Sequence, residues 1–269
     1  MSHDLLKDES LTELEIRSAF IKTFREVGRE RHRFEVFSDV VTLFAIEWRN
    51  AYKAFADKMP VLLDDKKEQE YISIIKKYKK EDHPKFALLF RLLVDLHSSG
   101  RPKDHLGDIY MSLDFGDSSK GQFFTPSHVS DLMARLSMSG FEEVIKSKGF
   151  ITLGDPACGA GSTFLAVVSM LMQQGYDPRR HLWIEGTDID RVAALMCYTQ
   201  LAMWGVPAMI YVGNSLSQEI REVWPTPTHM FEGWDVRLEN RQKIASTQKL
   251  AETSPAPASV RAEQLDFSF

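Results

Sequence analysis

Hydrophobic residues recur at steps of three or four through the first hundred residues, which predicts a series of helices. Ser10 followed by Glu13 has the spacing of a capping box, so we expect the first helix to begin there. Pro84 is expected to open another helix, with Leu89 and Leu93 on its apolar face. The clearest helical stripe lies between residues 34 and 55 and consists of Phe37, Val41, Phe44, Trp48 and Tyr52.

The pattern changes after Gly100, where several glycines occur with no long helical pattern between them, so a domain joint is expected within residues 99–120. From residue 150 onward, short apolar runs alternate with helical patterns. This alternation predicts an α/β fold with a mostly parallel sheet and right-handed crossovers, preceded by an all-helical domain. The expected strands lie at 151–153, 182–186 and 209–212, and the expected helices at 162–174 and 191–204.

Composition narrows the class of protein. The 269 residues are 43% hydrophobic and 26% charged, which is typical of a globular chain rather than a disordered or fibrous one. A formal net charge of -5 excludes a wholesale basic surface of the histone type, although it allows a local basic face. Two cysteines cannot build a disulfide framework, and the eight histidines form no ligand cluster, so we expect a cytoplasmic protein without a metal site. We find neither a signal peptide nor an apolar run of about 18 residues, which predicts no association with a membrane.

The residues most suggestive of chemistry follow the expected strands. The segment DPACGAGS, residues 155–162, stands between a predicted strand and a predicted helix, where glycines let the backbone approach a ligand. Asp155 beside this turn would repel a pyrophosphate but would suit a cationic or amino-bearing ligand. Asp188 ends the next strand and could accept both hydroxyls of a ribose. The segment GNSL, residues 213–216, follows the third strand, so three strand ends are expected to meet at one crevice.

These segments resemble the methylation subunits of type I restriction-modification systems, which are S-adenosylmethionine-dependent DNA adenine methyltransferases. Four segments match in the family's order: GQFFTP at 121–126, DPACGAGS at 155–162, TDID at 187–190 and GNSL at 213–216. In the family, the first segment and the glycine turn hold the methionine part of the cofactor, the acid binds the ribose, and the residue after the third strand lies by the adenine ring. By resemblance, the cofactor-binding residues are Phe124, Thr125, Pro126, Asp155, Gly159, Gly161, Ser162, Asp188 and Asn214.

The resemblance covers roughly residues 1–240 and implies a Rossmann-like methyltransferase fold with S-adenosyl-L-methionine as cofactor. It implies a helical domain over 1–118 and a cofactor-binding domain over 119–243. The remaining residues, 244–269, are rich in Ala, Ser, Pro and charge, so we expect a flexible tail there. The resemblance also implies methyl transfer to the amino nitrogen of adenine in DNA, with a specificity subunit or a second methylase chain as partner. At Asn214 a second interpretation stays open, because Gly-Asn is also common in turns.

The family's catalytic motif, Asn or Asp followed by Pro-Pro and an aromatic residue, is missing. No Pro-Pro pair occurs in the sequence, and the degenerate counterpart is Asn240, followed by Arg241, Gln242 and Lys243. The catalytic residues are therefore unknown. Only about half of the usual sheet can be assigned, which predicts an exposed sheet edge beside the crevice that another segment or chain must cover.

The end of the chain offers a different function. The last six residues resemble the short peptide with which many bacterial proteins dock on the DNA polymerase sliding clamp, and their docking side chains would be Gln264, Leu265, Phe267 and Phe269. The alternative to a methyltransferase is therefore a catalytically inactive, methylase-like interaction protein that modulates restriction and modification or docks on the clamp. An apolar end that folds back on the body would explain the same six residues.

Overall fold

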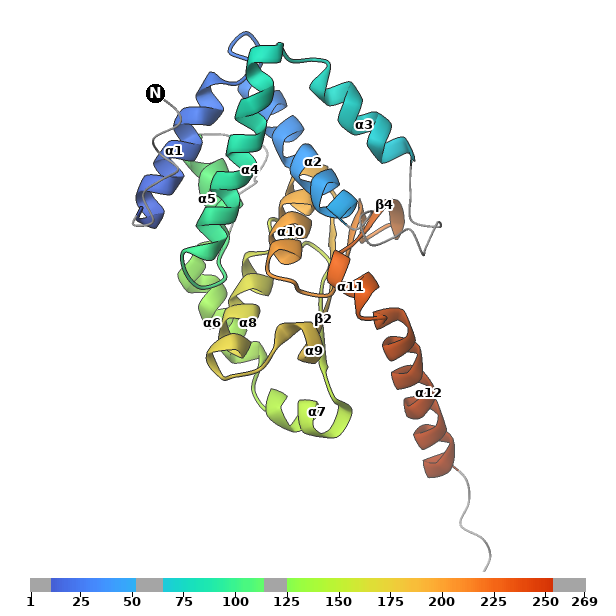
Figure 1. The fold of residues 1–269 in the computed structure, drawn as a ribbon. Coiled ribbons are helices and arrows are strands. Elements are labelled where there is room, and N and C mark those ends of the chain that lie inside the picture. Colours follow the sequence, from blue (N-terminus) through green and yellow to red (C-terminus); the bar gives the residue numbers. More distant parts are fainter. Residues whose placement is uncertain (1–10, 52–64, 114–124, 254–269) are drawn as a thin grey trace, which may run out of the picture. The chain divides into compact units, whose positions relative to one another are not determined.

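The computed structural model describes residues 11–51, 65–113 and 125–253, drawn as a ribbon in Figure 1. The chain divides into two compact units, Met1–Glu232 and Gly233–Phe269. In the first unit, helices come first and an α/β arrangement follows, as the sequence predicts.

The amino-terminal helices are α1 (Glu13–Glu26), α2 (Arg33–Ala51), α3 (Asp65–Ile75), α4 (His83–Ser98) and α5 (His105–Ser112). Their apolar faces are buried, and the rings of Phe24 and Phe37 meet edge to face at 6.0 Å. The expected start of the first helix is wrong by two residues, because the capping box consists of Thr12 and Glu15. There, the Glu15 amide donates to the Thr12 hydroxyl, and the Thr12 amide donates to the Glu15 carboxylate.

The second part of the unit contains a four-stranded sheet in the order β1-β2-β3-β4. β1 pairs with β2 and β2 with β3 in parallel, while β4 pairs with β3 antiparallel. The mostly parallel α/β class is thereby confirmed, and β4 is an addition that sequence analysis missed. The strands are β1 (Ile151–Asp155), β2 (Leu182–Asp188), β3 (Ala208–Asn214) and β4 (Glu219–Pro225).

The helices of this part are α6 (Ser127–Ser137), α7 (Phe141–Lys148), α8 (Ser162–Gln173), α9 (Pro178–His181), α10 (Arg191–Met203) and α11 (Pro227–Phe231). Gly175 and Gly205 follow α8 and α10 with φ of 82° and 64°, so each helix ends at a glycine in the left-handed conformation. Among the residues that the structure describes, β1 pairs on one side only, with β2, so the sheet has the expected open edge beside Asp155.

Helix α10 connects the helical part to the sheet. All residues from Val192 to Ala202 are buried, because α10 packs against β2 and β3 and also against α2 and α5. Figure 1 shows α10 beside α2 in the middle of the molecule. A helix that is apolar around its circumference is typical of such a sandwiched position. One continuous cluster of buried side chains therefore runs from α1 through the sheet.

The second unit contains α12 (Trp234–Thr253). This helix runs past residue 244, so residues 244–253 of the expected tail are helical, and the flexibility of the tail stays a prediction. Residues 254–269 lie outside the described residues. No helix in the described ranges has the length and apolar character needed to cross a membrane.

Candidate functional site

The carboxyl ends of the three parallel strands bring the predicted polar residues to one edge of the sheet. Asp155 is the last residue of β1, Asp188 of β2 and Asn214 of β3. Asp155 lies opposite Gly186, and Asp188 lies opposite Val212, so the two acids are offset by two residues along the same edge. Ligands bind at this end of open α/β sheets.

The glycine turn between β1 and α8 is held against the end of β2. The amide of Cys158 donates to the Thr187 carbonyl oxygen at 2.9 Å, and the amide of Gly159 donates to Asp188 Oδ2 at 2.8 Å. Gly159 and Gly161 have φ of 55° and 88°, a region that residues with a Cβ rarely adopt. The turn is thus locked in a conformation that depends on its glycines.

Asp188 is the central acid of the site. Its Oδ2 accepts from Gly159 and its Oδ1 accepts from the Asp190 amide at 2.8 Å, so the carboxylate is fixed at both oxygens. Burial raises the pKa of Asp188; these two amide hydrogen bonds lower it in part, and the negative charges of Asp190 and Asp155 raise it again. The net shift is upward, and a cation or a hydroxyl donor placed here would relieve the repulsion among the three acids.

The other two strand ends also make local contacts. Asp155 Oδ1 accepts from the Ala157 amide at 2.9 Å, inside its own turn. Asn214 Oδ1 accepts from the Leu216 amide at 3.0 Å, which is the turn geometry left open by the sequence. Asn214 therefore shapes the loop at the crevice through its side-chain oxygen.

The structure also brings the end of the GQFFTP segment to the start of α8. The Ser162 hydroxyl donates to the Thr125 carbonyl oxygen at 3.1 Å and lies 2.7 Å from the Ser130 hydroxyl of α6. Pro126 precedes α6 as its N-cap residue. Phe124 lies outside the described residues. Segments expected to share a cofactor are thus neighbours, although more than thirty positions separate Thr125 from Ser162.

The degenerate counterpart of the catalytic motif lies in the second unit. Asn240 lies inside α12 and is exposed, in the unit that begins at Gly233, and not at the end of a strand. Asn240 thus does not directly follow a strand, and its place as the counterpart of the family's motif stays a prediction. The clamp-docking candidates Gln264, Leu265, Phe267 and Phe269 lie outside the described residues.

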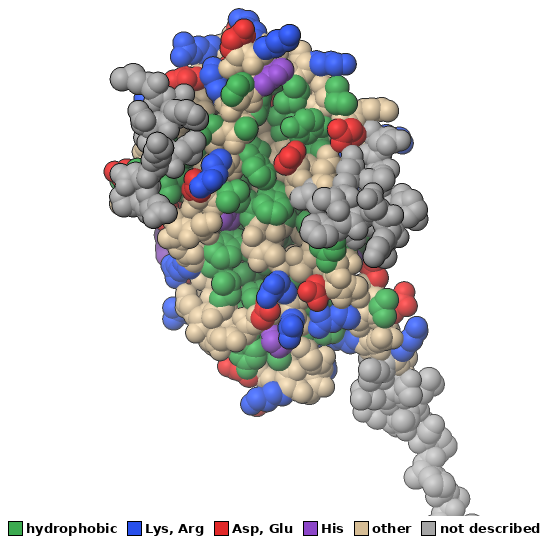
Figure 2. Space-filling model, viewed as in Figure 1, with side chains coloured by type: hydrophobic (Ala, Val, Ile, Leu, Met, Phe, Trp, Pro, Cys, Tyr) green, Lys and Arg blue, Asp and Glu red, His purple; other side chains and the backbone are tan. Residues whose placement is uncertain are grey.

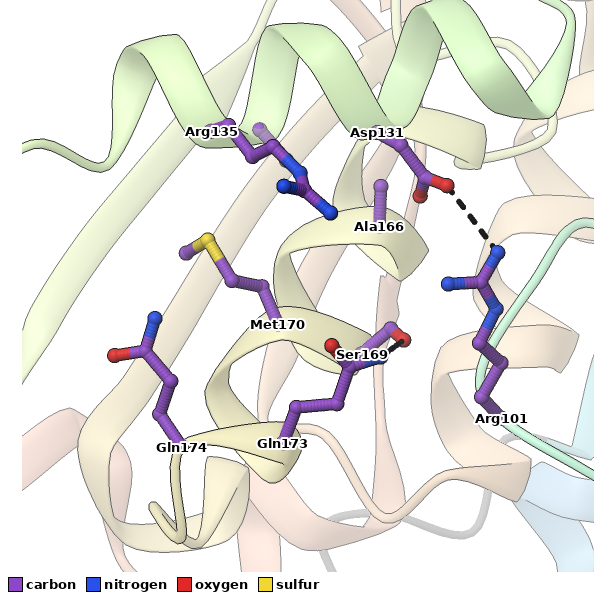
Figure 3. A pocket seen from close by; sticks show the side chains of 9 residues that line it. Arg101, Asp131, Arg135, Ala166, Ser169, Met170, Gln173 and Gln174 are labelled. Atoms are coloured by element: carbon purple, nitrogen blue, oxygen red, sulfur yellow. Dashed lines mark hydrogen bonds and ion pairs between the residues drawn. The ribbon is translucent and has the colours of Figure 1, made fainter.

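Figure 3 shows a hollow between α6 and α8, where Arg101 pairs with Asp131 at 3.2 Å and Arg135 and Gln173 complete the wall. On the face drawn in Figure 2, basic and acidic side chains are interspersed and hydrophobic ones occupy much of the middle. The described part of the chain holds no group of three or more potential metal ligands.

Sequence analysis missed one residue at the turn. Gln200 of α10 is fully buried, and its Nε2 donates to the Ala160 carbonyl oxygen at 3.0 Å. The available signal was an amide side chain inside an otherwise apolar helix.

A family model and two solved structures are similar to this chain. A family model described as N-6 DNA Methylase matches residues 101–248, more than half of the chain. One similar solved structure is described as a class I S-adenosylmethionine-dependent methyltransferase from Listeria monocytogenes, at 15% identity and a TM-score of 0.40, covering 77% of this chain and 56% of that one. Another is a type I restriction-modification methyltransferase subunit from Streptococcus thermophilus, at 16% identity and a TM-score of 0.42, covering 78% of this chain and 60% of that one. The chain thus spans less than two thirds of either structure, and no curated protein matches it significantly.

Proposed function

The chain belongs to the N-6 DNA methylase family, and we propose on that premise that it binds S-adenosylmethionine in the crevice at the ends of β1, β2 and β3. Its proposed activity is methyl transfer to the amino nitrogen of adenine in DNA, together with a partner chain. The partner is a specificity subunit or a second methylase chain.

The proposal rests on one observation, which is the hydrogen bonding between Asp188 and the glycine turn. The Asp188 carboxylate is fixed by two backbone amides, and each of its oxygens keeps a lone pair for a hydroxyl of the ribose. When bound, S-adenosylmethionine supplies a methyl group on a positively charged sulfur, and the negative charges of Asp155, Asp188 and Asp190 suit such a cation. The residues present therefore fit this cofactor.

We propose a partner chain because the adenine must be bound and positioned for the reaction. An adenine amino group must be turned out of the duplex and held in line with the methyl group. The sequence has no Pro-Pro-aromatic motif, and Asn240 lies in α12. Within the described residues the outer side of β1 is unpaired, next to Asp155, and a strand from another chain could bring adenine-binding side chains there.

Calorimetry with S-adenosylmethionine tests the cofactor proposal. Asp188→Asn removes the charge in a side chain of the same shape, and we expect at least about a tenfold loss of affinity because charge-assisted hydrogen bonds are lost. Glu185→Gln is the matched control, since it removes an exposed carboxylate from the same strand. No binding by the wild type, or equal binding by Asp188→Asn, would refute the proposal.

A second candidate is a catalytically inactive, methylase-like interaction protein, favoured by the position of Asn240 inside a helix. Labelled S-adenosylmethionine and unmethylated genomic DNA distinguish the two candidates. The partner-dependent enzyme is expected to label DNA only after the partner chain is added, and strong labelling by the purified protein alone would exclude the inactive form. Deleting residues 264–269 tests the sliding clamp as partner, since unchanged clamp binding would exclude this segment.

A further inference from the structure

The side-chain amide of Gln200 is buried, and both its nitrogen and its oxygen make hydrogen bonds. Its side chain is fully buried in α10. Nε2 donates to Asp104 Oδ1 at 2.9 Å and to the Ala160 carbonyl oxygen at 3.0 Å, and Oε1 accepts from the Leu106 amide at 3.0 Å. Both hydrogens of the amide nitrogen are therefore used, and a side chain without an amide cannot reproduce the set.

These contacts join two parts of the molecule that are distant in sequence. Ala160 lies between the two positive-φ glycines of the turn and is 1% exposed. Asp104 is the N-cap residue of α5 and accepts from the Gly107 amide at 2.7 Å with the oxygen that also binds Gln200. Gln200 thus ties the glycine turn to the first turn of α5.

A second contact joins Thr125 to the same turn. The chain leaves α5 at Ser112 and returns to the described structure at Thr125, whose carbonyl oxygen accepts from Ser162 at the start of α8. The beginning of α5 is anchored through Gln200, and the Thr125 end is anchored through Ser162. Both anchors act on the same strand-to-helix turn.

We propose that Gln200 is a positioning residue, which fixes the glycine turn in the conformation that receives the amino-acid part of S-adenosylmethionine. This inference rests on the proposed function for the identity of the ligand. The physical reason is that the Ala160 carbonyl is buried, so losing the Gln200 donor would leave an unsatisfied oxygen in the turn. The turn would move to satisfy it, and the amides of Cys158 and Gly159 would lose their positions at the end of β2.

The test compares two ligands on variants of the full chain. Gln200→Met keeps the length of the side chain and removes both donors, while Gln200→Glu keeps an acceptor for Leu106. Thr199→Val is the matched control, because Thr199 is a buried neighbour on α10 whose hydroxyl has no hydrogen-bond partner. Calorimetry is run with S-adenosylmethionine and with methylthioadenosine, which lacks the amino-acid part.

We expect both Gln200 variants to bind S-adenosylmethionine about tenfold more weakly, the effect of one lost buried hydrogen bond at the turn. Binding of methylthioadenosine should weaken by a smaller factor, because Asp188 keeps its hydrogen bond from the Asp190 amide when the Gly159 amide moves. Thr199→Val should bind both ligands as the wild type does. Unchanged affinity for S-adenosylmethionine, or an equal loss for both ligands, would overturn the positioning role. No binding by the wild type would instead refute the proposed function.

Amide hydrogen exchange without any ligand tests the same role independently of the cofactor. The amides of residues 158–161 should exchange faster in Gln200→Met and at the wild-type rate in Thr199→Val. Wild-type protection of these amides in Gln200→Met would show that the turn does not depend on Gln200, whatever the ligand.

Discussion

Asp104 is a buried acid whose charge should cost stability at neutral pH, and Asp104→Asn should remove that cost. Burial raises the pKa of Asp104 from 3.8 to about 6; hydrogen bonds from Gln200 and Gly107 lower it in part, and the charge of Asp108 raises it. Both hydrogen bonds go to Oδ1, so an asparagine can accept them with its amide oxygen. The substitution therefore changes the charge and keeps the contacts.

The direction in which stability changes with pH follows from proton binding. Because the pKa is raised in the folded state, the folded protein holds a proton that the unfolded chain has already lost between about pH 4 and pH 6, so stability falls as pH rises through this window. The full pKa difference between 3.8 and about 6 corresponds to about 3 kcal/mol in the free energy of unfolding. Between about pH 4.5 and pH 7.5 the remaining fall is about 2 kcal/mol, because the unfolded chain is already largely ionised at the lower pH.

Urea unfolding of wild type and Asp104→Asn across this range measures the effect as a difference. The difference is needed because the pKa of His97 is lowered to about 4 and that of His105 to about 3, mainly by burial, and both give the wild type the opposite slope. Relative to the wild type, the free energy of unfolding of Asp104→Asn should rise by about 2 kcal/mol between about pH 4.5 and pH 7.5. Thr199→Val is the control and should differ from wild type by a constant amount. A constant difference for Asp104→Asn as well would refute the reasoning.

Two further predictions concern the turn and the contact between the helices and the sheet. Gly161→Ala should destabilise the protein by more than Gly175→Ala in urea unfolding, because a Cβ at Gly161 would lie 2.8 Å from Cys197 Sγ whereas the one at Gly175 meets nothing within 4 Å. The positive φ alone should cost about 1 kcal/mol at either site, so equal losses would contradict the close packing of the turn. Burial raises the pKa of Glu222, but hydrogen bonds from Arg191 and a lysine outweigh it and hold the pKa at about 2. Its stabilising effect should be present above about pH 4.5 and be lost as pH falls towards 2, so Glu222→Gln should cost about 2 kcal/mol at neutral pH and much less near pH 3. An equal loss at both pH values would contradict this ion pair.

The parallel part of the fold could be predicted because each strand is a short apolar run followed by a glycine or an acid. β4 could not, because Trp224 is its only fully buried residue and the rest of the strand carries little pattern. The start of α1 shows a different limit. Thr12 and Glu15 have the same spacing as Ser10 and Glu13, and only the packing of the helix decides between them.

In the candidate site, too, the positions of some residues could be predicted from the sequence and those of others could not. Asp188 and the glycines stand where strands end, so their meeting follows from the parallel topology. Gln200 could not be assigned a role, because its partner Asp104 lies 96 positions away and contacts it only after α5 packs against α10. The helical location of Asn240 could not be predicted either, since motif order in a sequence says nothing about whether a residue ends a strand.

Helix α10 connects the amino-terminal helices to the glycine turn at the strand ends. At its start, Arg191 binds Glu222 of β4 at 2.5 Å and Glu70 of α3 at 2.8 Å. Further along, Cys197 packs under Gly161 and Gln200 binds Ala160. Because the opposite side of α10 packs on α2 and α5, any shift of these helices is transmitted to the turn through a densely packed element. The helical segment and the α/β segment therefore share one core, and the helices support the conformation of the glycine turn through α10.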